Sequence, residues 1–246
     1  MFSRLSNTIE KMRLQRLDPE AVGPAVHSLD AIGLLLGRGD KTMVSRMTAS
    51  ELGCRYLAER HEILPIISDR DTLRTFPEGS LGRLYCRFAE EKGLYPERLA
   101  EEVRSARAET DGLLPESTPE VAYLHDRYRD LHDVWHVVTG YGTDMAGELG
   151  IVALQSKQVG YRAMTISAFF QIIVIVLRTG RFDLVRTWIG GRRRGKRAQF
   201  LMSADWERLL RMPLEDVRAE LDVIPAGDYP TWDYPVSMKP KPAPSA

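Results

Sequence analysis

Cysteine and net charge are both scarce in this sequence. Only two of the 246 residues are cysteines, Cys54 and Cys86, and their spacing matches no zinc ribbon. Two such thiols also exclude a disulfide framework and fit a reducing compartment, so we expect both to be small core residues. The chain has 34 basic and 34 acidic residues. A net charge of zero gives no support for nucleic-acid binding through counterion release, and we expect no nucleic-acid partner.

Long apolar runs are absent as well. The most apolar stretch, residues 161–177, is shorter than the roughly 20 residues that a membrane-spanning helix needs. We expect it to be either a buried core helix, or the wall of a lipid cavity or a membrane-facing helix. The first residues lack the continuous apolar segment of a signal peptide, and acidic residues there argue against a transit peptide. These features predict a bacterial cytoplasmic protein, with a processed organellar protein as the alternative.

Helical periodicity dominates the rest of the chain, which predicts an all-α fold with a single helical domain. We expect an N-terminal arm at 1–24, a helical domain at 25–222 and a proline-rich, partly disordered tail at 223–246. Aromatic residues of the tail can dock on the body. The predicted helices span 25–36, 49–60, 69–75, 81–92, 97–109, 120–139, 143–158, 161–177 and 205–220.

Several local signals place the ends of these helices. Thr48 is the expected cap of the helix at 49–60, and Ser80 that of the helix at 81–92. The apolar run 63–67 reads as a short strand interrupted by Pro65. The basic run 190–197 is expected to be either a solvated helix start or a site for phosphate or anionic lipid headgroups.

The residues best suited to chemistry lie together in one stretch. His132 and His136 are four residues apart, which on a helix places both imidazoles on one face, one turn apart. Neutral imidazoles at this spacing are a common ligand pair for a divalent first-row metal ion. Asp133 lies about 100° around the helix from His132. It can therefore bind the ion directly or orient a ligand from behind.

A second carboxylate follows on the next predicted helix. Glu148 lies twelve residues after His136, beyond the helix-breaking sequence 140–142, and Thr143 is the expected cap of its helix. At about 1.5 Å of rise per residue, an antiparallel pair of helices brings Glu148 level with the histidines. We therefore predict that two imidazoles and two carboxylates form one metal site.

The nitrogen and oxygen ligands suit Zn²⁺, and also Co²⁺, Fe²⁺ or Mn²⁺. If Asp133 only orients a ligand, one coordination position stays open for substrate or water, as catalysis requires. The alternative is a pair of surface histidines beside unrelated acids. His125 is two helical turns from His132, which is far for a ligand, so it is either an ordinary partly buried histidine or a substrate-facing one.

At these residues the chain resembles the coenzyme Q (ubiquinone) biosynthesis protein four family, as a bacterial-type member. The family signature, HDxxH followed by eleven residues and glutamate, is present here without departure. Blocks at 77–83, 127–131 and 205–207 also look like the family, so the resemblance covers about residues 25–222. By motif match, it implies metal ligation and catalysis by His132, Asp133, His136 and Glu148.

The resemblance implies a metal-dependent carbon–carbon lyase of late ubiquinone synthesis. The reaction would remove the C1 carboxylate from a polyprenylated 4-hydroxybenzoate, with or without coupled C1 hydroxylation. Expected partners are this lipid or an isoprenoid quinone, other enzymes of the pathway, and the inner membrane, which the protein would meet peripherally from the cytoplasm. We also expect a homodimer.

Two other functions remain open from the sequence. In the first, the protein is a non-catalytic scaffold that holds prenyl lipids for other enzymes, and the metal is structural. In the second, it is a metallohydrolase, because HDxxH is similar to HExxH. The shorter aspartate would move the general base about one methylene away from the metal-bound water.

Overall fold

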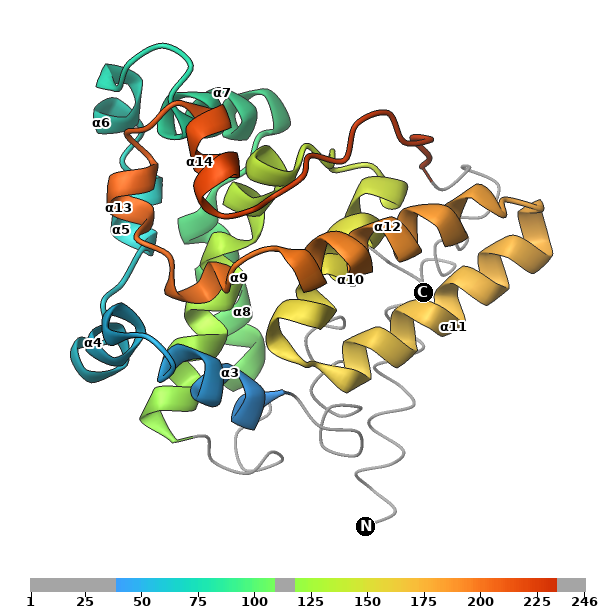
Figure 1. Cartoon of the computed structure of the whole chain (residues 1–246), viewed down its shortest axis with the longest axis horizontal. Helices are drawn as coiled ribbons and strands as arrows, with labels where there is room; N and C mark the ends of the chain where they lie inside the picture. The colour runs from blue at the N-terminus through green and yellow to red at the C-terminus, as the bar shows by residue number, and fades with distance from the viewer. Residues whose placement is uncertain (1–38, 109–117, 234–246) are drawn as a thin grey trace, which may run out of the picture.

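The computed structural model describes residues 39–108 and 118–233, and these residues fold into helices (Figure 1). Within these ranges the only β-type pairing is an isolated bridge between Ser80 and Pro213. The prediction of an all-α, single-domain fold is therefore confirmed. The predicted arm at 1–24, the helix expected at 25–36 and the tail beyond residue 233 lie outside the described residues.

Short connections join the helices. The described helices are, in chain order, α3 (Asp40–Met47), α4 (Glu51–Glu59), α5 (Leu64–Ser68), α6 (Arg70–Thr75), α7 (Leu81–Lys92), α8 (Pro96–Ala108), α9 (Pro119–Thr139), α10 (Met145–Val159), α11 (Arg162–Thr179), α12 (Asp183–Arg197), the 3₁₀-helix η1 (Leu201–Ser203), α13 (Trp206–Leu209) and α14 (Leu214–Glu220).

The long helix α9 occupies the centre of the molecule, with α10, α11 and α12 grouped along one side of it (Figure 1). Leu131, Val134 and Trp135 of α9 are fully buried in the main core, which also contains residues of α3, α7, α13 and α14. A smaller apolar cluster among α10, α11 and α12 includes Ile172 and Trp188. The site on α9 therefore lies where the main core meets the three-helix group.

One predicted helix cap and the strand expected at 63–67 were wrong, both for local reasons. Helix α4 is capped by Ser50, whose Oγ accepts the Gly53 N–H at 3.1 Å, and not by Thr48. The Thr48 hydroxyl instead donates to the Val44 carbonyl at the end of α3. The run 63–67 is not a strand, because Pro65 lies in the first turn of α5, where its missing N–H costs nothing.

The C-terminal elements also differ from the prediction. The single helix expected at 205–220 is split: α13 ends at Leu209, and Pro213, which has no N–H for a continuous helix, lies at the N-cap of α14. Trp206 and Val217 are nevertheless buried. Cys86 is a core residue as expected, whereas Cys54 is exposed.

The basic run 190–197 forms the second half of α12, so the expectation of a solvated helix start was wrong. Arg194 is turned inward and donates to the Tyr141 hydroxyl at 3.2 Å and to the Ala226 carbonyl at 2.9 Å. Arg193 and Lys196 remain exposed. One cation of the run therefore holds the C-terminal segment in place, while others face solvent.

Helix α11 is only partly buried, so of the two expected alternatives the buried core helix was wrong, and the lipid-facing helix stays a prediction. Ala168, Ile172 and Ile175 pack against α10 and α12, but the opposite face exposes apolar side chains. Phe170 is 62% exposed and Leu177 is 80% exposed. Among the described helices, none combines the length and apolar character needed to cross a bilayer.

Helices α10 and α12 pack with their backbones in close approach, and glycines make this possible. A Cβ atom added at Gly195 would lie 2.4 Å from the Leu154 carbonyl oxygen. A Cβ at Gly190, on the same helix, would lie 2.8 Å from Arg194 Nη1 and 3.8 Å from the Tyr141 hydroxyl, both at the ends of side chains. The face of α12 that carries Gly195 therefore packs against α10, the helix that carries Glu148.

We expect Gly195→Ala to lower the free energy of unfolding by about 1–3 kcal/mol, because the new methyl group must push α12 away from backbone atoms. Gly190→Ala is the matched control and should cost less, because the end of the Arg194 side chain can move aside whereas the Leu154 backbone cannot, and because alanine is the better helix former. Urea unfolding followed by circular dichroism measures both. Equal stability of the two variants would contradict this account of the packing.

Candidate metal centre

Helix α9 presents the two histidines on a well-defined helical segment. It begins at Pro119, and the Thr118 side chain accepts the Val121 N–H at 3.4 Å. It ends at Gly140, whose φ of 73° allows the left-handed turn that stops the helix. Cap, proline and terminal glycine were all readable from the sequence, which explains why the predicted span of this helix is confirmed.

Helix α10 brings the second carboxylate. Its cap is Asp144 and not Thr143: the Asp144 Oδ1 accepts the N–H groups of Ala146 at 3.1 Å and Gly147 at 3.2 Å. A carboxylate at this position is also favoured by the helix dipole. Glu148 lies in the first turn of α10, where the same dipole favours its ionised form.

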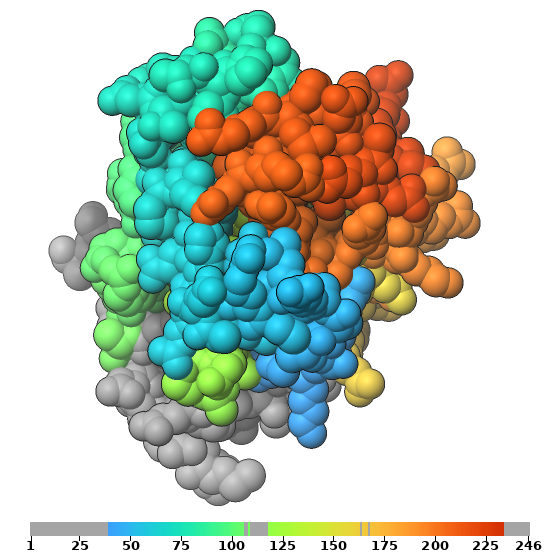
Figure 2. Space-filling view, turned by 60° about the vertical axis from the view of Figure 1, so that its left-hand side comes forward, coloured from blue at the N-terminus to red at the C-terminus, as the bar shows by residue number. Residues whose placement is uncertain are grey.

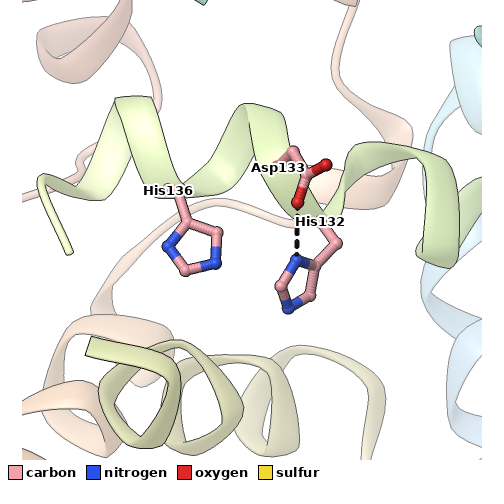
Figure 3. Close-up of side chains that lie close together, drawn as sticks. All are labelled: His132, Asp133 and His136. Carbon is pink, nitrogen blue, oxygen red and sulfur yellow. Dashed lines mark hydrogen bonds and ion pairs between the residues drawn. The ribbon is translucent and has the colours of Figure 1, made fainter. Parts of the chain in front are cut away.

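The structure brings His132, His136 and Glu148 together. The Nε2 atom of His132 is 3.5 Å from Glu148 Oε2, and the Nε2 atom of His136 is 3.3 Å from Glu148 Oε1. The two imidazole centroids are 4.8 Å apart, and both rings project from one side of α9 (Figure 3). Ligands about 2.0–2.1 Å from a tetrahedral ion stand roughly 3.3 Å from one another, so these separations suit one shared ion.

Asp133 contacts the His132 ring at Nδ1, the ring nitrogen that does not face Glu148. Its Oδ1 is 3.1 Å from His132 Nδ1 (Figure 3). This contact matches an arrangement in which a carboxylate orients a histidine whose Nε2 binds the metal. His132, Asp133 and His136 also offer atoms that all lie within 4.8 Å of one another. Asp133 is thus placed to orient His132, and it is near enough to join the ligands after a small movement.

His136 has a fixed tautomer. Its Nδ1 is 3.0 Å from the Tyr141 carbonyl oxygen, which can only accept, so Nδ1 carries the proton. The buried Nε2 has no hydrogen-bond partner and faces the Glu148 carboxylate with its lone pair. Two acceptors facing each other are stabilised by a cation between them. An orphaned buried nitrogen opposite a carboxylate therefore fits a divalent metal ion.

The charges in the cluster reinforce one another. Burial alone would raise the pKa of the Glu148 and Asp133 carboxyls, but in the metal-free cluster the two imidazoles, in their protonated forms, lower both pKa values below the ordinary range. Burial alone would lower the pKa of His132, but the Asp133 and Glu148 carboxylates raise it. Both carboxylates are therefore ionised at neutral pH, which is the form that binds a metal.

Helix α7 packs against the cluster beside His136. The Phe88 ring stacks on His136 with centroids 6.0 Å apart. The buried Tyr85 hydroxyl has no hydrogen-bond partner, and burial together with the Asp133 charge raises its pKa. The sequence gave no signal that α7 would pack against these residues. His125 is an ordinary histidine paired with Asp40 at 2.8 Å.

Comparison with known proteins decides the family. A model of the coenzyme Q (ubiquinone) biosynthesis protein Coq4 family matches residues 40–227. The chain belongs to the Coq4 family. The predicted resemblance is confirmed, although its bacterial-type subclass stays a prediction, and so does the antiparallel arrangement of the two helices that carry the cluster.

The similarity to other Coq4 proteins covers most of this chain. The Drosophila ananassae protein named mitochondrial ubiquinone biosynthesis protein COQ4 homolog is 30% identical over 203 residues, covering 81% of this chain and 72% of its own. The Danio rerio homologue of the same name is 30% identical over 75% of this chain and 65% of its own. These relatives are mitochondrial, so the predicted bacterial location stays a prediction.

A solved structure shares the Coq4 fold. A crystal structure from Nostoc punctiforme PCC 73102, provisionally assigned to ubiquinone biosynthesis, superposes with a TM-score of 0.63. It covers 89% of this chain and 95% of its own at 20% sequence identity. At this identity the likeness concerns the fold alone. A role in ubiquinone biosynthesis follows for this chain from its family.

Proposed function

We propose that this Coq4 protein is a metal-dependent enzyme that removes the C1 carboxylate from a polyprenylated 4-hydroxybenzoate. The observation that carries the proposal is the placement of two histidine Nε2 atoms 3.3 and 3.5 Å from the two oxygens of Glu148. His132, His136 and Glu148 would hold the ion, and Asp133 would orient His132 or join them. Zinc is the first candidate, and cobalt, iron and manganese suit the same ligands.

The reaction needs the kind of surroundings that these residues provide. Breaking the bond between C1 and the carboxylate releases CO₂ and leaves an electron pair on C1, which must take up a proton. A bound divalent ion would supply a Lewis acid that anchors the carboxylate and stabilises negative charge. The Glu148 side chain is 35% exposed and that of His132 26%, so solvent reaches the cluster and can supply the proton.

Coupled hydroxylation of C1 would place a further demand on the site. It uses O₂ as the oxidant: replacing the carboxylate by a hydroxyl from water releases CO₂ and two electrons, which would reduce O₂ to hydrogen peroxide, and zinc has no redox chemistry. This version of the reaction therefore requires a redox-active ion, or the phenolate ring itself as the electron donor. Running the assay with and without oxygen distinguishes the two versions of the proposal.

The exposed face of α11 supports a lipid-facing role. Ile166, Phe170, Ile173 and Leu177 recur at helical spacing, and all four are exposed. No aspartate or glutamate occurs from 149 to 182, and only Asp183 occurs up to residue 204, against ten lysines and arginines between 149 and 204. An apolar face in such a basic segment suits an anionic membrane surface, from which a prenylated substrate could enter.

The same apolar face also favours the second candidate function, a scaffold that holds prenyl lipids for other enzymes. In that case the metal would be structural. A metallohydrolase is not supported by the family assignment. Association with other ubiquinone biosynthesis proteins and formation of a homodimer remain predictions of the sequence.

The test is a decarboxylation assay with a polyprenylated 4-hydroxybenzoate labelled in its carboxyl carbon. The purified protein, loaded in turn with Zn²⁺, Co²⁺, Fe²⁺ or Mn²⁺, is incubated with and without oxygen. We expect labelled CO₂ and a ring product carrying hydrogen or hydroxyl at C1. Retention of the label under every condition, with the lipid bound, would overturn the enzymatic proposal and favour the scaffold.

A further inference from the structure

The segment 225–233, which we call the C-terminal strap, crosses the turn between α9 and α10. At one end the Ala226 N–H donates to the Thr139 carbonyl at 2.7 Å. At the other end the Trp232 carbonyl accepts the Ala146 N–H at 3.2 Å. The Coq4 family match ends at residue 227, so Tyr229 and Trp232 lie beyond it. The strap therefore adds contacts of this chain to the turn that joins the two halves of the metal centre.

Tyr229 makes the central contacts of the strap. Its hydroxyl accepts the Gly142 N–H at 2.7 Å and donates to Asp144 Oδ2 at 2.6 Å. Its ring packs edge-on against Tyr141 with centroids 5.3 Å apart. One hydroxyl group therefore links the backbone of the turn to the cap of α10.

The two contacts of Tyr229 lead to the two halves of the metal centre. The Tyr141–Gly142 peptide group is held at both ends, because its carbonyl accepts from His136 Nδ1 and its N–H donates to Tyr229. The other contact holds Asp144, whose Oδ1 also accepts the Trp232 N–H at 2.9 Å. The carbonyl of Asp144 accepts the Glu148 N–H at 2.8 Å.

We propose that Tyr229 is a positioning residue for the metal centre. Its hydroxyl fixes the Tyr141 carbonyl, so that His136 keeps its proton on Nδ1 and presents the Nε2 lone pair. Through Asp144 it also fixes the start of α10, so that Glu148 stays opposite the imidazoles. This inference rests on the proposed metal-binding function.

The strap does not depend on the Tyr229 hydroxyl for its attachment. Arg194 donates to the carbonyl oxygens of Ile224, Pro225 and Ala226. Trp232 packs against the apolar cluster among α10, α11 and α12. Removal of one hydroxyl group should therefore leave the strap in place and change the metal centre more than the stability.

The first measurement is the affinity for Co²⁺, followed by its visible absorption, in the full-length protein. We expect Tyr229→Phe to weaken binding about 10-fold, the lower end of the range for partners that orient metal ligands, and to change the cobalt spectrum. Tyr95→Phe is the matched control, because Tyr95 is 49% exposed in the connection between α7 and α8. Unchanged affinity and spectrum in Tyr229→Phe would overturn the inference.

The second measurement is the tautomer of His136 in the metal-free protein, read from the ¹⁵N shifts of its ring. We expect Nδ1–H in the wild type and a mixture of tautomers in Tyr229→Phe. Asp144→Asn should act in the same direction, and the double variant should be little worse than either single one, because both break one chain of hydrogen bonds. If the wild type binds no Co²⁺, the proposed function fails, and an unchanged His136 tautomer would separately overturn the role of Tyr229.

Discussion

His132→Ala is expected to lower the affinity for Zn²⁺ or Co²⁺ by more than about 100-fold, beyond the loss caused by removing an orienting partner. The variant loses one of the two Nε2 atoms that face Glu148, and Asp133 loses the ring that it orients. It should release no labelled CO₂ from the carboxyl-labelled substrate. The fold should survive, because the His132 side chain is 26% exposed and its truncation opens no fully enclosed cavity.

The matched control is His61→Ala, which removes a partly exposed imidazole that contacts Glu207 outside the cluster. Metal affinity is measured by competition with a chelator, and thermal unfolding is compared with and without EDTA. Full activity in His132→Ala would refute the catalytic assignment. If metal removal unfolds the wild type, and the metal-loaded wild type releases no labelled CO₂, the metal is structural and the scaffold function is favoured.

The predictable part of the site depended on signals that are local in the sequence. Four-residue spacing fixed the relation of His132 to His136, and Gly140 marked the end of their helix. The helical break then left Glu148 in the first turn of the next helix. A pattern of three or four residues determines such features, and tertiary packing has little influence on them.

The contacts that the sequence did not predict are made between distant segments. Nothing around Tyr229 indicates that its hydroxyl would meet Gly142 and Asp144, more than 80 residues earlier. The partner of His136 is a backbone carbonyl, which every residue possesses. The sequence left the burial of α11 open between two alternatives for a related reason: the helix is apolar on all sides, so its sequence does not reveal which side other helices cover.

The apolar face of α11 leads to the second large expected effect, on membrane binding. We expect the double variant Phe170→Asp and Leu177→Asp to bind vesicles of mixed phosphatidylcholine and anionic phospholipid more than about 100-fold less tightly than the wild type. Burial of each side chain is worth about 1.5–3 kcal/mol, and roughly 1.4 kcal/mol corresponds to a factor of ten. Arg162 and Arg178, near the two ends of the helix, are placed to meet the anionic headgroups.

Vesicle co-sedimentation at low and high salt measures this binding. Tyr95→Asp is the control for an added charge at an exposed aromatic outside α11. The corresponding alanine variants separate lost apolar area from added charge. Higher salt should weaken wild-type binding only in part, because screening acts on the arginines and leaves the apolar contribution intact. The double variant Phe170→Asp and Leu177→Asp could instead bind vesicles normally but change from dimer to monomer in sedimentation velocity. In that case a second copy of the chain covers this face, and the membrane assignment is wrong.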